Sequence, residues 1–220
     1  MPKSAGAILA ALLFLTSITF AQDGHFDASI NAGAVFTKTS TGNGISATAT
    51  DGMNLFGTIR ARFKPKHSVL FNFGRTKDSQ VYQAGSDFHV LSTITEYTGA
   101  YMYSPVKRGK FEPFVFAGGG VLRFNPQSTY VFLPQLPDNI PNNVLVNVGA
   151  TNQTRIAFLY GLGVDYKLYW KFALRLQYRG FLYKAPDFNV QTSSTGSSLS
   201  FFTGAYGHMA EPTAGLVFRF

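Results

Sequence analysis

The chain has 220 residues and no cysteine, and its 19 basic and 11 acidic residues give a formal net charge of +8. Without cysteine it can form no disulfide and can use no thiolate chemistry. The 22 Gly, 22 Phe and 11 Tyr, with only 14% charged residues, are unusual for a soluble domain. The basic residues form no cluster, so we expect no nucleic-acid partner.

The first 21 residues have the features of a secretory signal peptide. Lys3 supplies the positive charge, and residues 5–20 are uncharged. Thr19 and Ala21 are small residues at the two positions that signal peptidase recognises before a cleavage site. A membrane anchor is the alternative, but the apolar run is shorter than the roughly 20 residues of a spanning helix. We predict a signal peptide over residues 1–21 and one mature domain over residues 22–220.

Alternation of apolar residues with a period of two is the main signal in the mature chain. Over residues 155–168 the even positions are Ile, Phe, Tyr, Leu, Val, Tyr and Leu, and the odd positions are Arg, Ala, Leu, Gly, Gly, Asp and Lys. Because successive side chains of a strand point to opposite faces, this pattern predicts a strand with one apolar face. Similar patterns predict eight strands, over residues 26–38, 53–63, 67–76, 89–103, 111–124, 154–168, 171–184 and 206–220.

The connections between these strands alternate in length. The short ones cover residues 64–66, 104–110 and 169–170, and the long ones cover residues 39–52, 77–88, 125–153 and 185–205. This alternation is typical of an up-and-down transmembrane barrel, which has tight periplasmic turns and long outer loops. An even number of strands then places both ends of the domain at the periplasmic side.

Two all-β architectures fit eight alternating strands, and they differ in which face is the interior. A soluble barrel or sandwich turns its apolar face inward, whereas an outer-membrane barrel turns it toward lipid. We favour the second, because the non-apolar faces carry many arginines, which suit a crowded polar interior. The predicted lumen charge network is Arg60, Arg62, Glu96, Arg123, Asp165, Lys167, Arg175, Arg179 and Arg219.

Two further features concern the predicted network and the strand ends. The basic excess in the network calls for water or loop carboxylates, such as Asp187 and Glu211, as partners. Aromatic residues also gather at the strand ends, as in the interfacial girdles of membrane proteins. They are Tyr97, Tyr101, Tyr103, Phe111, Tyr166, Tyr169, Trp170 and Tyr183.

The last residues, GLVFRF, resemble the signal that the outer-membrane barrel assembly machinery reads on its clients. The matching residues are Gly215, Leu216, Phe218 and Phe220. The whole mature chain resembles the OmpA-like eight-stranded outer-membrane β-barrel superfamily, and residues 113–120 and 174–188 are similar to strands of small porin-like proteins of Acidobacteria. The resemblance implies an all-β, eight-stranded antiparallel up-and-down transmembrane β-barrel in the outer membrane of a Gram-negative bacterium. We expect no cell-wall tether, since no peptidoglycan-binding domain follows Phe220.

No motif predicts catalytic, cofactor or metal chemistry. His25, His67, His89 and His208 lack the spacing of a metal site, so we expect no metal. Residues 118–120, Gly-Gly-Gly, lie within a strand, where glycine allows curvature or close packing rather than phosphate binding, so we expect no cofactor. A lipid A-modifying acyl hydrolase using the adjacent His67 and Ser68, or His208, stays a minor alternative.

We therefore predict a non-enzymatic outer-membrane protein with a structural or surface-interaction role carried by its extracellular loops. Its partners would be outer-membrane lipid and lipopolysaccharide, the assembly machinery during biogenesis, and an extracellular ligand at residues 125–153. That loop is apolar in places, which has two interpretations: the fifth and sixth strands continue above the membrane as a hairpin, or the loop packs on itself or on its neighbours. The alternative is a small, anion-leaning pore or a carrier for small or apolar solutes. A lumen filled by side chains argues against it, because eight strands enclose little more than that.

Overall fold

The computed structural model describes residues 25–83, 87–132, 151–188, 190–191, 198–199 and 203–220. The predicted signal peptide lies outside this part of the chain and stays a prediction. The described residues form strands, turns and irregular segments, and none of them forms a helix long and apolar enough to cross a membrane.

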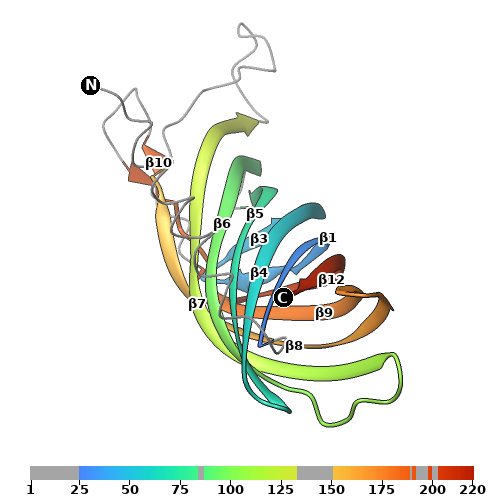
Figure 1. Ribbon diagram of the computed structural model, residues 1–220. Helices are drawn as coiled ribbons and strands as arrows, with labels where there is room; N and C mark the ends of the chain where they lie inside the picture. The colour runs from blue at the N-terminus through green and yellow to red at the C-terminus, as the bar shows by residue number, and fades with distance from the viewer. Residues whose placement is uncertain (1–24, 84–86, 133–150, 189, 192–197, 200–202) are drawn as a thin grey trace, which may run out of the picture.

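Eight long antiparallel strands close into a barrel (Figure 1). They are β1 (Phe26–Lys38), β4 (Gly52–Lys64), β5 (His67–Gln83), β6 (Asp87–Tyr103), β7 (Phe111–Phe132), β8 (Gln153–Tyr169), β9 (Phe172–Lys184) and β12 (Tyr206–Arg219). Each strand pairs with the one before and after it in this series, and β12 pairs with β1 to close the sheet. The predicted fold is confirmed, and five of the eight predicted ranges agree to within one residue at each end.

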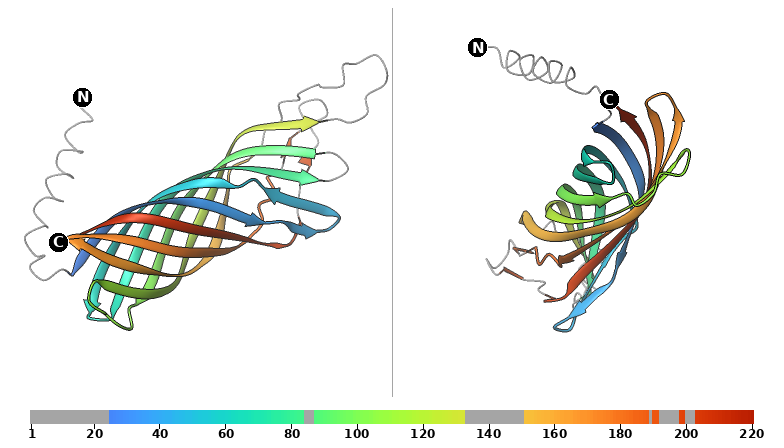
Figure 2. Two further views of the ribbon diagram at one scale, coloured as in Figure 1. Left: turned by 90° about the vertical axis from the view of Figure 1, so that its right-hand side faces the viewer. Right: turned by 60° about the horizontal axis from the view of Figure 1, so that its bottom comes forward.

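The two ends of the barrel differ as the connection lengths predict. Asp27 at the start of β1 pairs with Arg219 at the end of β12, so both strands meet at the end that carries the short turns. Figure 2 shows the carboxyl terminus at this end and the tips of β5, β6 and β7 at the other. We call them the turn end and the loop end. By the rule for outer-membrane barrels, we expect the turn end to face the periplasm.

The loop end contains more strand than predicted. β5 and β6 continue through most of the predicted 77–88 connection, and β7 runs to Phe132. β2 (Ser40–Gly42) and β3 (Ile45–Ala49) form a hairpin whose second strand pairs with β5, and β10 (Val190–Gln191) pairs with β11 (Ser198–Leu199). The predicted extension of the fifth and sixth strands as one hairpin is wrong in its pairing. β7 continues beyond Phe124 against β6, while β8 begins only at Gln153. Residues 133–150 of that loop lie outside the described chain.

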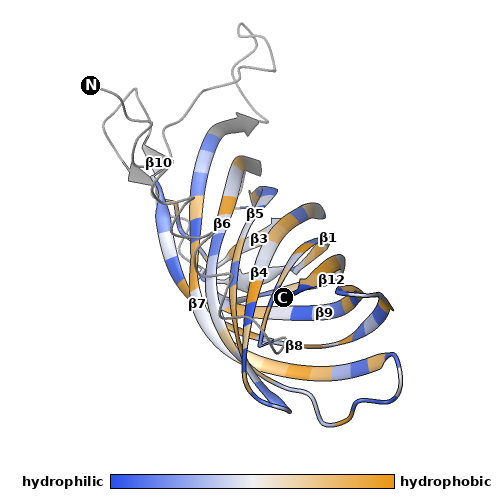
Figure 3. Ribbon diagram, viewed as in Figure 1, coloured by the Kyte–Doolittle hydropathy of each residue, from blue (hydrophilic) through white to orange (hydrophobic). Residues whose placement is uncertain are grey.

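The two faces of the sheet are sorted in the way that lipid requires. Ile30, Met53 and Ile156 are 70%, 77% and 83% exposed on the outside, whereas Arg60 and Arg175 are fully buried on the inside. Figure 3 shows the alternation of hydrophilic and hydrophobic residues along the strands. An apolar exterior around a charged interior is the arrangement of a transmembrane barrel and the reverse of a soluble one. The predicted orientation of the faces is confirmed.

Glycine in β8 makes room for rings that cross the lumen. A Cβ at Gly161 would lie 2.3 Å from Cζ of Phe116, and a Cβ at Gly163 would lie 2.6 Å from Cζ of Phe114. Real Cβ atoms do not approach that closely, so any larger residue there would displace the two phenyl rings. Glycine thus allows close packing in β8, as was predicted for residues 118–120 of β7.

Candidate functional site

The lumen is the best-defined candidate site, and it is filled along its length by side chains of two kinds. Charged and hydrogen-bonding groups predominate at the turn end and in the middle, where Met102, Phe114 and Phe116 are also buried. Apolar and aromatic groups predominate at the loop end, where Asp78 and Gln80 are also buried. All eight long strands contribute, because every second residue of each points inward.

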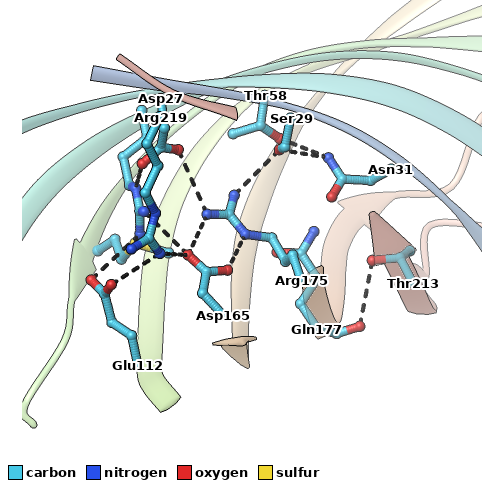
Figure 4. Close-up of polar contacts among 12 residues, drawn as sticks. Asp27, Ser29, Asn31, Thr58, Glu112, Asp165, Arg175, Gln177, Thr213 and Arg219 are labelled. Atoms are coloured by element: carbon cyan, nitrogen blue, oxygen red, sulfur yellow. Dashed lines mark hydrogen bonds and ion pairs between the residues drawn. The ribbon is translucent and has the colours of Figure 1, made fainter. Parts of the chain in front are cut away.

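An ionic cluster occupies the turn end (Figure 4). Its centre is Asp165 of β8, which accepts two hydrogen bonds from Arg175 of β9, at 2.7 Å from Nε and 2.9 Å from Nη2. Nη2 of Arg60 lies 3.1 Å from Oδ2 of Asp165 without the alignment of a hydrogen bond, so this contact is mainly electrostatic. Nε of Arg60 donates to Asp27 of β1. The bidentate pair between β8 and β9 thus joins a chain of ion pairs that reaches two further strands, β4 and β1.

Glu112 of β7 extends the cluster to the rim of the turn end. Its Oε1 accepts a hydrogen bond from Nη2 of Arg62 at 2.9 Å, and its Oε2 lies 3.1 Å from Nη2 of Arg219. Lys107, in the adjacent turn, has a pKa lowered by partial burial, an effect that Glu112 opposes and the nearby Arg62 reinforces. The rim of the turn end thus brings Lys107, Arg62 and Arg219 close to the carboxylate of Glu112.

Arg179 of β9 organises the middle of the lumen. Its Nη2 lies 2.6 Å from Oε2 of Glu96, and its Nε donates to Oε2 of Glu211 at 2.7 Å. Its guanidinium Cζ lies 3.7 Å from the ring centroid of Phe56, in cation–π geometry. Nδ2 of Asn54 donates to the same Glu211 oxygen at 2.7 Å. A single arginine therefore links two carboxylates on opposite sides of the barrel. Each carboxylate also accepts a hydrogen bond from a second side chain, Glu211 from Asn54 and Glu96 from Thr98.

The structure brings together seven of the nine predicted network residues and excludes two. Arg123 is exposed on the outer face of β7, because its neighbours Leu122 and Phe124 are the inward residues there. Lys167 is exposed at the turn end and forms no ion pair with any described carboxylate. Both predictions are wrong. Counting every second residue along a strand does not show where apolar side chains replace charged ones in the lumen, as at Arg123. It also does not show where the lumen ends, as at Lys167.

Two network carboxylates, Asp27 and Glu112, escaped the sequence prediction. Asp27 follows the outward-facing Phe26, so the alternation of polar and apolar residues could have identified it. Glu112 shares its inward face with Phe114 and Phe116, so the alternation does not mark that face as polar. With them, the network holds five arginines and five carboxylates, so the basic excess that suggested an anion-leaning pore is absent. The arginines are Arg60, Arg62, Arg175, Arg179 and Arg219, and the carboxylates are Asp27, Glu96, Glu112, Asp165 and Glu211.

The loop end of the lumen is closed by an apolar cluster and a segment of chain after β9. Phe188 has a positive φ of 46° and is fully buried, with its ring centroid 6.1 Å from those of Tyr82 and Phe124. Nη2 of Arg155 donates to Oδ1 of Asp187 at 2.8 Å, so this loop carboxylate pairs with an arginine. Burial and an ion pair together hold residues 185–188 over the lumen.

The outer aromatic residues form a girdle at the turn end. Phe218 packs against Phe172, Trp170 and Phe220, with centroid distances of 5.2, 6.5 and 5.6 Å. Tyr183 does not belong to a girdle, because it is buried in the lumen 5.6 Å from Phe124.

The predicted assembly-signal residues are placed on both faces of β12. Leu216 and Phe218 point outward, while Gly215 faces inward, where a Cβ would lie 2.1 Å from Oδ1 of Asn31. Gly215 is thus required for packing, and the assembly role of these residues stays a prediction.

The histidines on the outer face are bonded to tyrosines. His67 contacts the Tyr101 hydroxyl within an aromatic cluster, while Ser68 is buried on the opposite face of β5. Nε2 of His208 lies 2.6 Å from the Tyr160 hydroxyl. His67 and Ser68 therefore point to opposite faces, which removes the pair that suggested an acyl hydrolase. Nδ1 of His25 lies 3.1 Å from the Arg62 carbonyl oxygen, and the side chain of His89 lies outside the described residues.

Comparisons with known proteins give the fold a context. No protein-family model and no curated protein match the chain. A major outer membrane protein from Thermus thermophilus is similar in structure, with a TM-score of 0.52 and 15% identity over 89% of this chain and 99% of that one. Neisserial surface protein A gives a TM-score of 0.49 and 16% identity over 90% and 98% of the two chains. The chain thus has the fold of an eight-stranded transmembrane β-barrel, like that of a bacterial outer-membrane protein, and its apolar exterior is of the kind that contacts lipid.

Proposed function

We propose that the protein is a non-conducting, non-enzymatic outer-membrane barrel whose role is structural or surface-interacting and is carried by its loop end. The observation that carries the first part is the filled lumen. Arg175 at the turn end, Arg179 in the middle and Phe188 at the loop end are each at most 1% exposed. A solute or ion crossing the barrel would have to displace all three layers.

The loop end supports the second part of the proposal. β7 has 22 residues, nine more than β4, and β5 and β6 have 17 each. At about 3.4 Å per residue, the additional length of β7 corresponds to about 30 Å of strand. This extension, with the β2–β3 hairpin paired to β5, forms a platform beyond the apolar belt. We propose that it is the interaction surface, together with residues 125–153.

Two observations argue against the alternatives. The equal numbers of arginines and carboxylates in the lumen argue against an anion-leaning pore, and the small cavity at the loop end argues against a carrier. The cavity at the loop end beside Tyr183 and Pro186 has a volume of ≈ 20 Å³. A water molecule needs roughly 10–15 Å³ on this scale, so the cavity has room for about one. A carrier for apolar solutes would first have to displace residues 185–188.

The conductance of the purified barrel in a planar lipid bilayer tests the non-conducting part. We expect no steady conductance from protein that shows the heat-modifiable gel migration of a folded barrel. Steady channels at the same protein concentration, whether anion-selective or not, would contradict the filled lumen as the state of the protein in lipid.

Display of the loop end at the cell surface can be tested with single cysteines, because the natural chain has none. Gln83→Cys, exposed near the tip of β5, should react with a membrane-impermeant maleimide on intact cells. Lys66→Cys, in the exposed β4–β5 turn, is the matched control and should react only after the outer membrane is permeabilised. The opposite labelling pattern would invert the barrel and remove the proposed interaction surface.

A further inference from the structure

The charges of the barrel are sorted by sign between its two faces. The strand carboxylates with described side chains are all buried: Asp27, Asp78, Glu96, Glu112, Asp165 and Glu211. Toward the loop end, the exposed charged residues of the long strands are instead basic: Lys38, Arg75, Lys77, Arg123 and Lys184. An outer surface of this kind, at the border of the apolar belt, is complementary to an anionic layer.

Three of these cations gather on the outer faces of β5 and β7. Arg75 is paired in register with Thr95, and Thr95 with Arg123, so the two arginines flank one threonine on β6. Lys77 lies two residues farther toward the loop end, opposite Thr93. Within the described part of the chain, none of the three forms an ion pair or a hydrogen bond through its side chain. Arg75 and Lys77 line a groove of ≈ 670 Å³ with Met53, Leu55, Thr93 and Gln127.

An apolar groove lies directly below, toward the turn end, on the same strands. It has a volume of ≈ 500 Å³, and Ile59, Phe71, Phe73 and Tyr97 line it. Gly57 and Gly99 form part of its floor, because neither has a side chain to fill it. Phe73 and Arg75 are two residues apart on one face of β5, which places the two grooves about 7 Å from each other.

We propose that the outer face of β4, β5 and β6 binds a phosphorylated lipid of the outer leaflet. The lipid phosphate lies on Arg75 and Lys77, and an acyl chain lies in the groove between Phe71, Phe73 and Tyr97. An unpaired cation at a lipid-facing surface is costly, and a phosphate oxygen satisfies both its charge and its N–H donors. The adjoining apolar groove favours a lipid over a soluble phosphate, since only a lipid would occupy both grooves.

The phosphate contact is tested on the full mature barrel in zwitterionic detergent, by native mass spectrometry with phosphorylated lipid A and with enzymatically dephosphorylated lipid A. Each basic residue near an anionic lipid contributes about 1 kcal/mol, or about fivefold in affinity. Arg75→Gln with Lys77→Gln should therefore weaken binding of the phosphorylated lipid by about 25-fold. The control is Lys64→Gln with Lys66→Gln, which removes two exposed cations at the turn end and should change the affinity by less than about twofold.

The acyl contact is tested by filling its groove. Gly57→Leu adds a side chain where the nearest atom to a Cβ is the Ser29 carbonyl oxygen at 3.9 Å, so the barrel should accept it. We expect binding of phosphorylated lipid A to weaken several-fold while the heat-modifiable gel shift is unchanged. Inorganic phosphate should not displace the bound lipid.

Three results would overturn the proposal. They are equal binding of dephosphorylated lipid A, unchanged affinity of the Arg75 and Lys77 double variant, and full displacement of the lipid by inorganic phosphate. None of them bears on the filled lumen or on labelling at the loop end, so the proposed function would stand or fall separately.

Discussion

The turn end and middle of the lumen are stabilised mainly by ion pairs, whereas the loop end is stabilised mainly by apolar packing. The turn end and middle hold ten charged groups in two sets of ion pairs, one around Asp165 and one around Arg179. The loop end holds an apolar cluster that includes Leu122, Phe124, Leu159, Phe181 and Phe188. In the ionic part each group depends on a named partner at a fixed distance. In the apolar part the aliphatic and phenyl side chains have no polar partner and depend mainly on the volume around them. The first should therefore tolerate substitution far less well than the second.

The sharpest way to break this comparison is to remove the cation that two carboxylates share. Arg179→Met keeps most of the side-chain volume but leaves Glu96 and Glu211 buried without a counter-charge. Removing one member of a buried ion pair costs about 3–5 kcal/mol, so we expect a loss of that size in the free energy of unfolding. Urea unfolding in phosphatidylcholine vesicles, followed by the fluorescence of the single tryptophan Trp170, measures it.

A compensating variant separates lost pairing from lost packing. Arg179→Met combined with Glu96→Gln and Glu211→Gln removes the charges of the whole group and should recover most of the stability. If the triple variant were as unstable as Arg179→Met alone, packing against Phe56 rather than charge pairing would be the main role of Arg179.

The apolar half should respond to volume rather than to chemistry. Leu159 is fully buried in the cluster, and Leu159→Ala should lower the free energy of unfolding by about 2–4 kcal/mol through the cavity it leaves. Leu159→Met, which conserves volume, should cost less than about 1.5 kcal/mol in the same urea assay. Equal losses for the two variants would mean that this half is as specific in shape as the ionic half.

The sequence predicts the barrel more fully than the lumen, and the reason lies in the period of two. Alternation alone assigns the faces of β4, β9 and β12, because charged and apolar residues alternate along them. It fails along β7, where Phe114, Phe116, Leu122 and Phe124 all face inward. An apolar lumen beside an apolar exterior leaves no contrast between the faces, so Arg123 was assigned to the wrong side and Glu112 was missed.

The extent of β5, β6 and β7 was hidden for a related reason. Residues 77–80 and 125–129 are mostly polar, and outside the apolar belt a strand no longer has a lipid-facing side to mark it. Their strand structure is specified by cross-strand pairing, such as that of Gln83 with Asp87, which a single sequence does not display. Residues 185–188 give no sequence signal of their own for the burial of Phe188 in the lumen.

The segment after β9 gives a more local test of the loop end. Phe188→Ala removes the ring that packs against Tyr82 and Phe124, while Asp187 keeps its ion pair with Arg155. We expect faster hydrogen exchange at residues 185–188 and at the loop end of β5, with a loss of about 1–2 kcal/mol in global stability, because this segment can detach without opening the barrel. Protection that is unchanged at residues 185–188 would show that the Asp187–Arg155 pair holds the segment by itself.

The smallest expected effect tests the assignment of faces on β7. Arg123 and Arg219 were both assigned to the lumen network by their sequence, but only Arg219 forms ion pairs, with Glu112 and Asp165. Arg123→Gln should change the free energy of unfolding in zwitterionic vesicles by less than about 0.5 kcal/mol, as for an exposed residue without a partner. Arg219→Gln is the matched control and should cost about 1–2 kcal/mol, since its partners are buried although its own guanidinium is partly exposed. The reverse order would place Arg123 inside, and the five-to-five balance of charges in the lumen would fail with it.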